Sequence, residues 1–196
     1  MSIAQRALIL GSTSRYRREL LERLRVPFDV VSPDVDETPL AGEAPQALAT
    51  RLALAKAKAV AAQHPHAVVI GSDQVADLHG EPLGKPGTHE RAVLQLQRMR
   101  GQTVVFQTAV SVVCLDSRFE KTELAQIKVR FRDLSDAEIE AYLRAEEPYN
   151  CAGSAKSEGL GISLISNMRG DDPNALIGLP LIKLITMLQN ENVSVI

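Results

Sequence analysis

The feature that most constrains the fold is an apolar run that stops at a cluster of small polar residues. The run covers 7–10, the polar turn Gly11-Ser12-Thr13-Ser14 follows, and Leu20, Leu21 and Leu24 then recur at helical spacing. A buried strand that passes through a tight turn into an amphipathic helix is typical of sheets covered by helices. The beginning of the chain therefore predicts an α/β fold.

The remaining sequence alternates strands with helices and then changes to a hairpin. We expect strands over 26–31 and 67–71 and helices over 44–63 and 88–99, the first of these helices being rich in small alanines. An antiparallel pair is predicted over 103–115 and 122–132, then a helix opened by a capping box at Ser135 and Glu138, a strand over 162–165 and a final helix over 180–188. These elements predict one α/β domain over residues 1–196, with a mixed sheet and a cleft between two lobes.

Composition narrows the classes of partner. The chain has 196 residues, 45% of them hydrophobic, and 22 basic against 24 acidic side chains give a net charge of −2. Such a balance supplies no long-range field for a DNA or RNA backbone, so a nucleic-acid-binding module is disfavoured. No stretch reaches the roughly 20 apolar residues of a membrane span, and no secretory signal precedes the first strand. We expect a cytoplasmic protein.

Three arginines crowd the first turn of the helix predicted after Gly11. Arg15, Arg17 and Arg18 stand where the helix dipole is positive, which disfavours cations. An anion would remove this conflict, because phosphate oxygens accept hydrogen bonds from serine hydroxyls, free backbone N–H groups and an arginine. Alternatively, the serines simply cap the helix and the arginines face water. This segment alone leaves both interpretations open.

Acidic side chains could complete a site for phosphate and a metal ion. Asp73 follows the apolar strand predicted over 67–71, at the edge where open α/β sheets usually bind ligands. A carboxylate there can hold a metal or deprotonate water, although a solvated turn aspartate would look the same. Asp34, Asp36 and Glu37 add oxygen ligands of the kind that Mg²⁺ prefers, if their loop lies near Asp73.

Further basic side chains occur on the alanine-rich helix and in a later loop. Arg51 and Lys56 are five residues apart, roughly 140° around a helix axis, so they do not face one point directly. Lys85 stands between Gly84 and Pro86 in a stiff loop, where it can reach a phosphate as a point charge. Each of these residues also has a plain interpretation as a solvated charge.

Taken in order, these segments resemble the Maf family of nucleotide pyrophosphatases. Residues 12–17 match its Ser-x-Ser-x-x-Arg opening, 36–37 its acidic pair, and 51–57 its Arg-Leu-Ala-x-x-Lys-Ala helix. Gly71-Ser72-Asp73 and Gly84-Lys85-Pro86 follow in register. Each motif is short, but five in the same order extend over nearly the whole chain.

The resemblance implies an elongated two-lobed α/β fold, a homodimer and a required divalent cation such as Mg²⁺, Mn²⁺ or Co²⁺. It implies that Asp73 is the base that activates water for attack on the α-phosphorus of a nucleoside triphosphate. Phosphate-binding side chains would be Ser12, Ser14, Arg17, Lys56 and Lys85, and metal ligands Glu37 and Asp73.

Within the family, three features resemble the branch that acts on 7-methyl-GTP rather than the pyrimidine-nucleotide branch. They are Tyr16, Gln74 and the segment 153–159, which contains Glu158. A guanine methylated at N7 is cationic, so Tyr16 can stack on it and Glu158 can accept hydrogen bonds from its edge. The alternatives are a dTTP or UTP pyrophosphatase of the same family, or a nucleotide-binding regulator of cell division without turnover.

Overall fold

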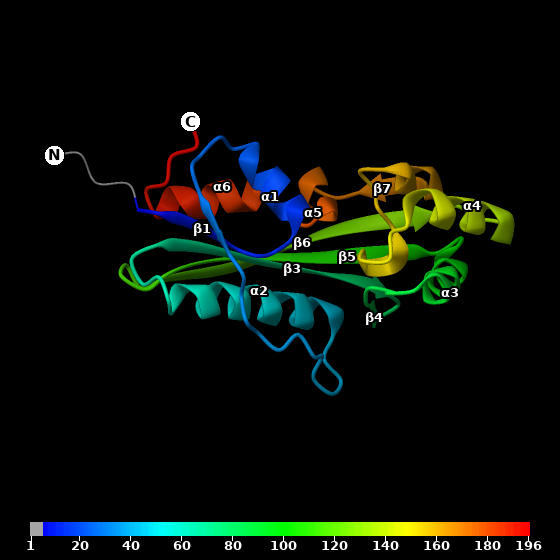
Figure 1. The fold of residues 1–196 in the computed structure, drawn as a ribbon, viewed down its shortest axis with the longest axis horizontal. Helices are drawn as coiled ribbons and strands as arrows, with labels where there is room; N and C mark the ends of the chain where they lie inside the picture. Colours follow the sequence, from blue (N-terminus) through cyan, green and yellow to red (C-terminus); the bar gives the residue numbers. More distant parts are fainter. Residues whose placement is uncertain (1–5) are drawn as a thin grey trace.

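The apolar residues of the first strand are buried on both sides, which places that strand inside a sheet. The computed structural model describes residues 6–196 and shows one elongated mixed sheet with helices on both faces (Figure 1). Its strands are β1 (Leu8–Gly11), β2 (Asp29–Val31), β3 (Val68–Leu78), β4 (Glu81–Leu83), β5 (Thr103–Cys114), β6 (Phe119–Phe131) and β7 (Ile165–Arg169). The order is β2-β1-β3-β5-β6-β7, and β4 pairs with β3. The predicted α/β fold with a mixed sheet is confirmed.

The helices divide the core along the sheet. They are α1 (Arg15–Glu22), α2 (Pro45–Ala61), α3 (His89–Met99), α4 (Asp136–Glu146), α5 (Pro173–Ile177) and α6 (Leu181–Asn190), with 3₁₀ turns η1 (Ala152–Ser154) and η2 (Leu160–Leu164). Leu8 and Leu10 pack with α1 and α6, whereas Ile9 packs with α2 on the other face, as the two-residue period of a strand requires. Helices α3 and α4 cover the far end of the sheet (Figure 1).

The strand β3 is longer than the sequence predicts, and this positions the site. It pairs in parallel with β1 only as far as Gly71, opposite Gly11, but pairs antiparallel with β5 as far as Asp77. The polar residues after Gly71 looked like a strand end, yet they continue the β5 ladder. Asp73 is therefore in the middle of β3, two residues past the level at which β1 turns away, and not at the strand's carboxyl end.

Close packing of α2 on β3 depends on small residues. A Cβ on Gly71 would lie 2.3 Å from the carbonyl oxygen of Ala53 and 2.6 Å from the backbone nitrogen of Ala57. Because all three residues are small, the helix backbone touches the strand directly. The alanine-rich helix predicted over 44–63 is confirmed, ending two residues earlier at Ala61.

Other boundaries differ in ways that local chemistry explains. β2 begins at Asp29 rather than residue 26, and Pro27, which lacks an N–H for the ladder, precedes it. The last strand is β7, not 162–165, because the Leu160 N–H bonds to Glu146 and the Gly161 N–H to the Lys156 carbonyl, which winds this segment into η2. The short elements β4 and α5 were not predicted. The capping box at Ser135 and Glu138 is confirmed.

Within residues 6–196, no helix combines the length and apolar character that crossing a bilayer would require.

Candidate active site

Hydrogen bonds at the start of α1 hold the Arg17 side chain beside the N-terminus of the helix. Ser14 is the N-cap and its hydroxyl accepts from the Arg17 backbone N–H at 3.4 Å. The Ser12 hydroxyl accepts from the Ser14 N–H at 3.2 Å and from Arg17 Nη1 at 3.4 Å, while Arg17 Nε donates to the Gly178 carbonyl at 2.9 Å. The serines thus cap the helix as the plain interpretation expects, but Arg17 does not extend into solvent. Burial lowers the pKa of Arg17, and Asp73 and Glu37 oppose this shift.

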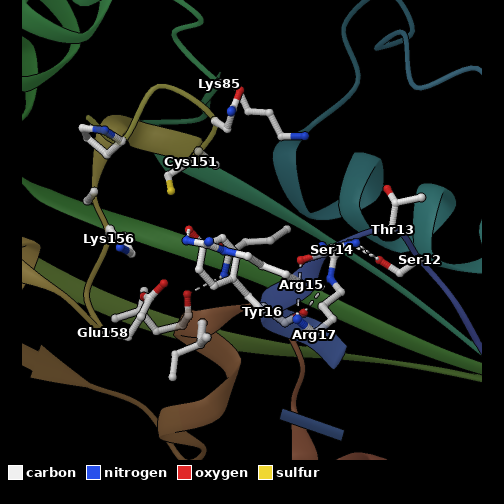
Figure 2. A pocket seen from close by; sticks show the side chains of 18 of the residues that line it. Ser12, Thr13, Ser14, Arg15, Tyr16, Arg17, Lys85, Cys151, Lys156 and Glu158 are labelled. Carbon is white, nitrogen blue, oxygen red and sulfur yellow. Dashed lines mark hydrogen bonds between the residues drawn. The ribbon is translucent and has the colours of Figure 1, made fainter. Parts of the chain in front are cut away.

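One cleft of about 770 Å³ gathers many of the residues that the sequence singled out, although Arg18, Asp34, Asp36, Arg51 and Asp73 are not in its lining. Its lining includes Ser12, Ser14, Tyr16, Arg17, Glu37, Lys56, Gln74, Lys85 and Glu158. Figure 2 shows Tyr16 and Arg17 at the start of α1, with Lys85 and Glu158 on other segments bordering the same space. Separate stretches of the chain, far apart in sequence, meet there.

Asp73 reaches this cleft through a lysine. It is 8% exposed, and its Oδ1 accepts from Lys56 Nζ at 2.6 Å. The same ammonium lies 2.7 Å from Oε1 of Glu37. Lys56 lines the cleft, whereas Asp73 is not among the lining residues of the described chain. The two carboxylates are thus brought to one point from β3 and from the loop before α2.

The carboxylate pair suits a hard divalent cation. Among residues 6–196, no cluster of three or more His, Cys, Asp or Glu side chains could hold a metal. Mg²⁺, however, is commonly held by one or two carboxylates, with water and substrate phosphates completing its shell. Burial raises the pKa of Glu37, but the hydrogen bond and charge of Lys56, with Lys85 and Arg17, lower it further, so the net shift is downward. An ionised Glu37 has the donor chemistry that such an ion needs.

An aromatic ring and carboxylates form another part of the cleft. The guanidinium carbon of Arg15 lies 4.7 Å from the centre of the Tyr16 ring, and Arg15 Nη2 donates to the Tyr16 hydroxyl at 3.0 Å. This contact shows that a planar cation can occupy the Tyr16 face. Glu158 is exposed and borders the same cleft. Burial raises the pKa of the nearby Cys151 thiol, so that group is a poor nucleophile at neutral pH.

Gln74 is held by the short helix α5. Its Nε2 atom lies 3.0 Å from the Thr108 hydroxyl and 2.9 Å from each of the carbonyls of Ala175 and Leu176. These acceptors fix the direction of the amide, and the side chain borders the cleft. The role of α5 was invisible in the sequence because its five residues are too few for a periodic pattern.

The structure separates the two basic residues of α2. Lys56 faces Asp73, while Arg51 turns to the loop, donating to both Glu43 oxygens at 2.6 and 2.7 Å and to the Thr38 carbonyl at 3.1 Å. This agrees with the separation of roughly 140° expected from the sequence. Arg15, one of the three arginines singled out at the start of the first helix, and Lys156, from the singled-out segment 153–159, also line the cleft. Sequence reasoning missed Glu146 as a cleft residue, because nothing in the sequence marks it.

Comparison with known proteins identifies the family of the chain. The family model described as Maf-like protein matches residues 7–191. The chain belongs to the Maf-like family. The Maf-like match spans every helix and strand described above, from β1 to α6.

Several Maf-like relatives are similar over almost their whole length. A protein of a Polaromonas species is 70% identical over 96% of this chain and 86% of its own. Proteins of Albidiferax ferrireducens and Cupriavidus metallidurans are 66% and 60% identical, covering 98% and 94% of this chain and 96% and 92% of their own. All three are named 7-methyl-GTP pyrophosphatase.

Proposed function

We propose that this protein hydrolyses 7-methyl-GTP to 7-methyl-GMP and pyrophosphate. The observation that carries the proposal is one cleft whose lining combines two kinds of side chain. Arg17, Lys56 and Lys85 supply positive charge to it, and Tyr16 and Glu158 supply an aromatic face and a carboxylate. A triphosphate needs the first and a cationic base the second. The names of relatives that are 60 to 70% identical support the same substrate.

Recognition of the base follows from its charge. Methylation at N7 leaves guanine with a positive charge, and Tyr16 already contacts the planar cation of Arg15. Stacking of such a cation on an aromatic ring contributes about 0.5–2 kcal/mol, depending on desolvation. Glu158 would accept from the N–H groups of the guanine edge, whereas the carbonyl oxygens of a pyrimidine would repel it.

Phosphate binding would use the start of α1 and two lysines. Ser12 and Ser14 exchange their present hydrogen bonds for phosphate oxygens, together with the backbone N–H groups of the first helical turn. Arg17 and Lys85 then neutralise oxygens of the triphosphate. Lys56, which now contacts two carboxylates, offsets the charge that develops on the leaving pyrophosphate.

Asp73 would take the proton of the attacking water. The water oxygen forms a bond to the α-phosphorus as the bond from that phosphorus to the α,β-bridging oxygen breaks, so pyrophosphate leaves with the bond's electron pair. Glu37 and Asp73 would hold the divalent cation, Mg²⁺, Mn²⁺ or Co²⁺. When bound, this ion supplies charge neutralisation at the phosphates.

Isotope mapping with a substrate panel tests the reaction. In water enriched in ¹⁸O, the label should enter 7-methyl-GMP and not pyrophosphate, because attack is at the α-phosphorus. Turnover of 7-methyl-GTP should exceed that of GTP, dTTP and UTP, and should stop with a chelator. Faster dTTP or UTP turnover would select the pyrimidine alternative. Binding without pyrophosphate release from any nucleotide would select the regulator.

Two further proposals come from the resemblance and the sequence rather than from the cleft. We infer a homodimer, for which light scattering should give about twice the 21.3 kDa chain mass. The cytoplasmic location also stays a prediction, to be tested by fractionation of the cells that make the protein.

A further inference from the structure

The segment that carries Glu158 is fastened to one face of α4. The Tyr142 hydroxyl accepts from the Lys156 backbone N–H at 3.1 Å and donates to the Ser154 carbonyl at 3.2 Å. One turn later, Glu146 accepts from the Lys156 ammonium and, at 2.8 Å, from the Leu160 N–H. Positions four apart on a helix share a face, so both contacts come from one side of α4.

The carboxyl group of Glu146 lies close against this segment at Gly159. A Cβ on Gly159 would lie 2.7 Å from Oε2 of Glu146 and 3.0 Å from its carboxyl carbon. The hydrogen bond from Lys156 and that from the Leu160 N–H lower the pKa of Glu146, which is therefore ionised at neutral pH. A negatively charged Glu146 thus holds the segment that carries Glu158 through Lys156 and Leu160.

Glu158 itself makes no ion pair with any residue in the range 6–196. Lys156, two residues away, borders the same cleft, and Figure 2 shows both side chains on one segment. A lysine ammonium on its flexible stem pairs with whichever carboxylate is in reach. Glu146 binds the Lys156 ammonium, so the Glu158 carboxylate stays available to a ligand.

We propose that Glu146 is a positioning residue for base recognition: it binds Lys156 and thereby keeps the Glu158 carboxylate available to the donor edge of a cationic purine. This role rests on the proposed function. It predicts that loss of the Glu146 charge lets Lys156 turn to Glu158 and neutralise it. The base preference would then fall while the phosphate-binding residues stay intact.

Binding of reaction products, measured by calorimetry, tests this without turnover. The wild type should bind 7-methyl-GMP more tightly than dTMP. In Glu146→Gln, which keeps an acceptor for the Leu160 N–H, this preference should fall about tenfold or more, the range expected for a hydrogen bond to a charged group. Adding Lys156→Met to that variant should restore the preference, because the competing ammonium is gone.

A matched control is Glu147→Gln, which removes the next carboxylate along the cleft wall, one whose side chain has no hydrogen-bond partner among residues 6–196. It should keep most of the preference. Hydrogen exchange at the Leu160 amide, read without nucleotide, should accelerate in Glu146→Ala and change less in Glu146→Gln.

Two kinds of failure are distinguishable. A wild type without preference for 7-methyl-GMP would overturn the proposed function. A wild-type preference that survives in Glu146→Gln would overturn the role of Glu146 alone. So would a double variant that is no better than Glu146→Gln, because a purely structural anchor would not be rescued by removing Lys156.

Discussion

The proposed chemistry depends on Asp73, and the conservative substitution Asp73→Asn tests whether this residue serves catalysis or stability. Asp73→Asn should lower pyrophosphate release by about 10²- to 10⁴-fold, the contribution typical of a general base. The asparagine carbonyl can still accept from Lys56 Nζ, which now lies 2.6 Å from the carboxylate. The melting temperature should therefore change little.

Asp116→Asn is the matched control for this substitution, because it removes an exposed carboxylate that contacts only His66 in the described chain. It should leave both turnover and melting temperature close to those of the wild type. Unfolding of Asp73→Asn at room temperature would instead identify Asp73 as structural, and undiminished turnover would exclude it as the base.

At the scale of elements, the close contact between α2 and β3 at Gly71 can be tested by adding one methyl group. In Gly71→Ala, the new methyl group would overlap the backbone of Ala53 and Ala57, which cannot rotate away as a side chain would. Overpacking of this kind costs about 1–3 kcal/mol. Thermal unfolding should show a decrease of about 2–4 °C for each kcal/mol lost in a chain of this size.

Gly84→Ala provides the comparison, since nothing lies within 4 Å of the place its new methyl group would take and its φ is not positive. Its melting temperature should match the wild type. An equally stable Gly71→Ala protein would show that α2 can move away from the sheet at no cost, and the close approach would then have no energetic importance.

The loop before α2 gives a pH-dependent prediction. Hydrogen bonds from Arg51 and from the Leu40 N–H lower the pKa of Glu43 from 4.5 to about 2. A carboxyl group with a lowered folded-state pKa stabilises the fold above its unfolded pKa, and this stabilisation is lost as pH falls toward the folded value. Glu43→Gln should therefore melt below the wild type at pH 7, and the difference should narrow as pH falls from 4.5 to about 2.

For this loop, Glu22→Gln is the appropriate comparison, because it removes an exposed ion pair between Arg18 and Glu22 that contributes little. Its melting temperature should follow the wild type at every pH. A Glu43→Gln protein whose deficit stays constant down to a pH of about 2 would mean that packing, and not ionisation, links Glu43 to Arg51.

How far sequence reasoning reached also differs by element. Long segments such as α2, α3 and β5 were predicted to within about two residues, because apolar residues recur along the helices and run almost without interruption through the strand. The predicted end of β3 was wrong, because the polar residues after Gly71 suggested a turn, whereas they continue the antiparallel pairing with β5. The contact between Glu146 and Lys156 was not predicted, because it depends on where α4 ends relative to the segment 153–159, which no local pattern encodes.

Across the whole molecule, the cleft draws residues from both ends of the chain, and so a ligand there should stabilise the entire fold. Ser12 comes from the turn after β1 and Arg17 from α1. Glu158 comes from the segment after α4, and Gly178 from the turn before α6. Binding of 7-methyl-GMP at about a hundred times its Kd should add about 2.7 kcal/mol to the free energy of unfolding. A chain of this length gains about 2–4 °C per kcal/mol, so the melting temperature should rise by several degrees.

The same measurement with GMP at equal concentration should give a smaller rise, because an uncharged guanine loses the attraction to the Tyr16 face. In Tyr16→Leu, which keeps apolar area but no π-face, the difference between the two ligands should become smaller, and what is left of it would come from the Glu158 carboxylate. Equal shifts for GMP and 7-methyl-GMP in the wild type would show that the cleft does not sense the charge of the base. The proposed recognition of a cationic base by Tyr16 and Glu158 would then be wrong.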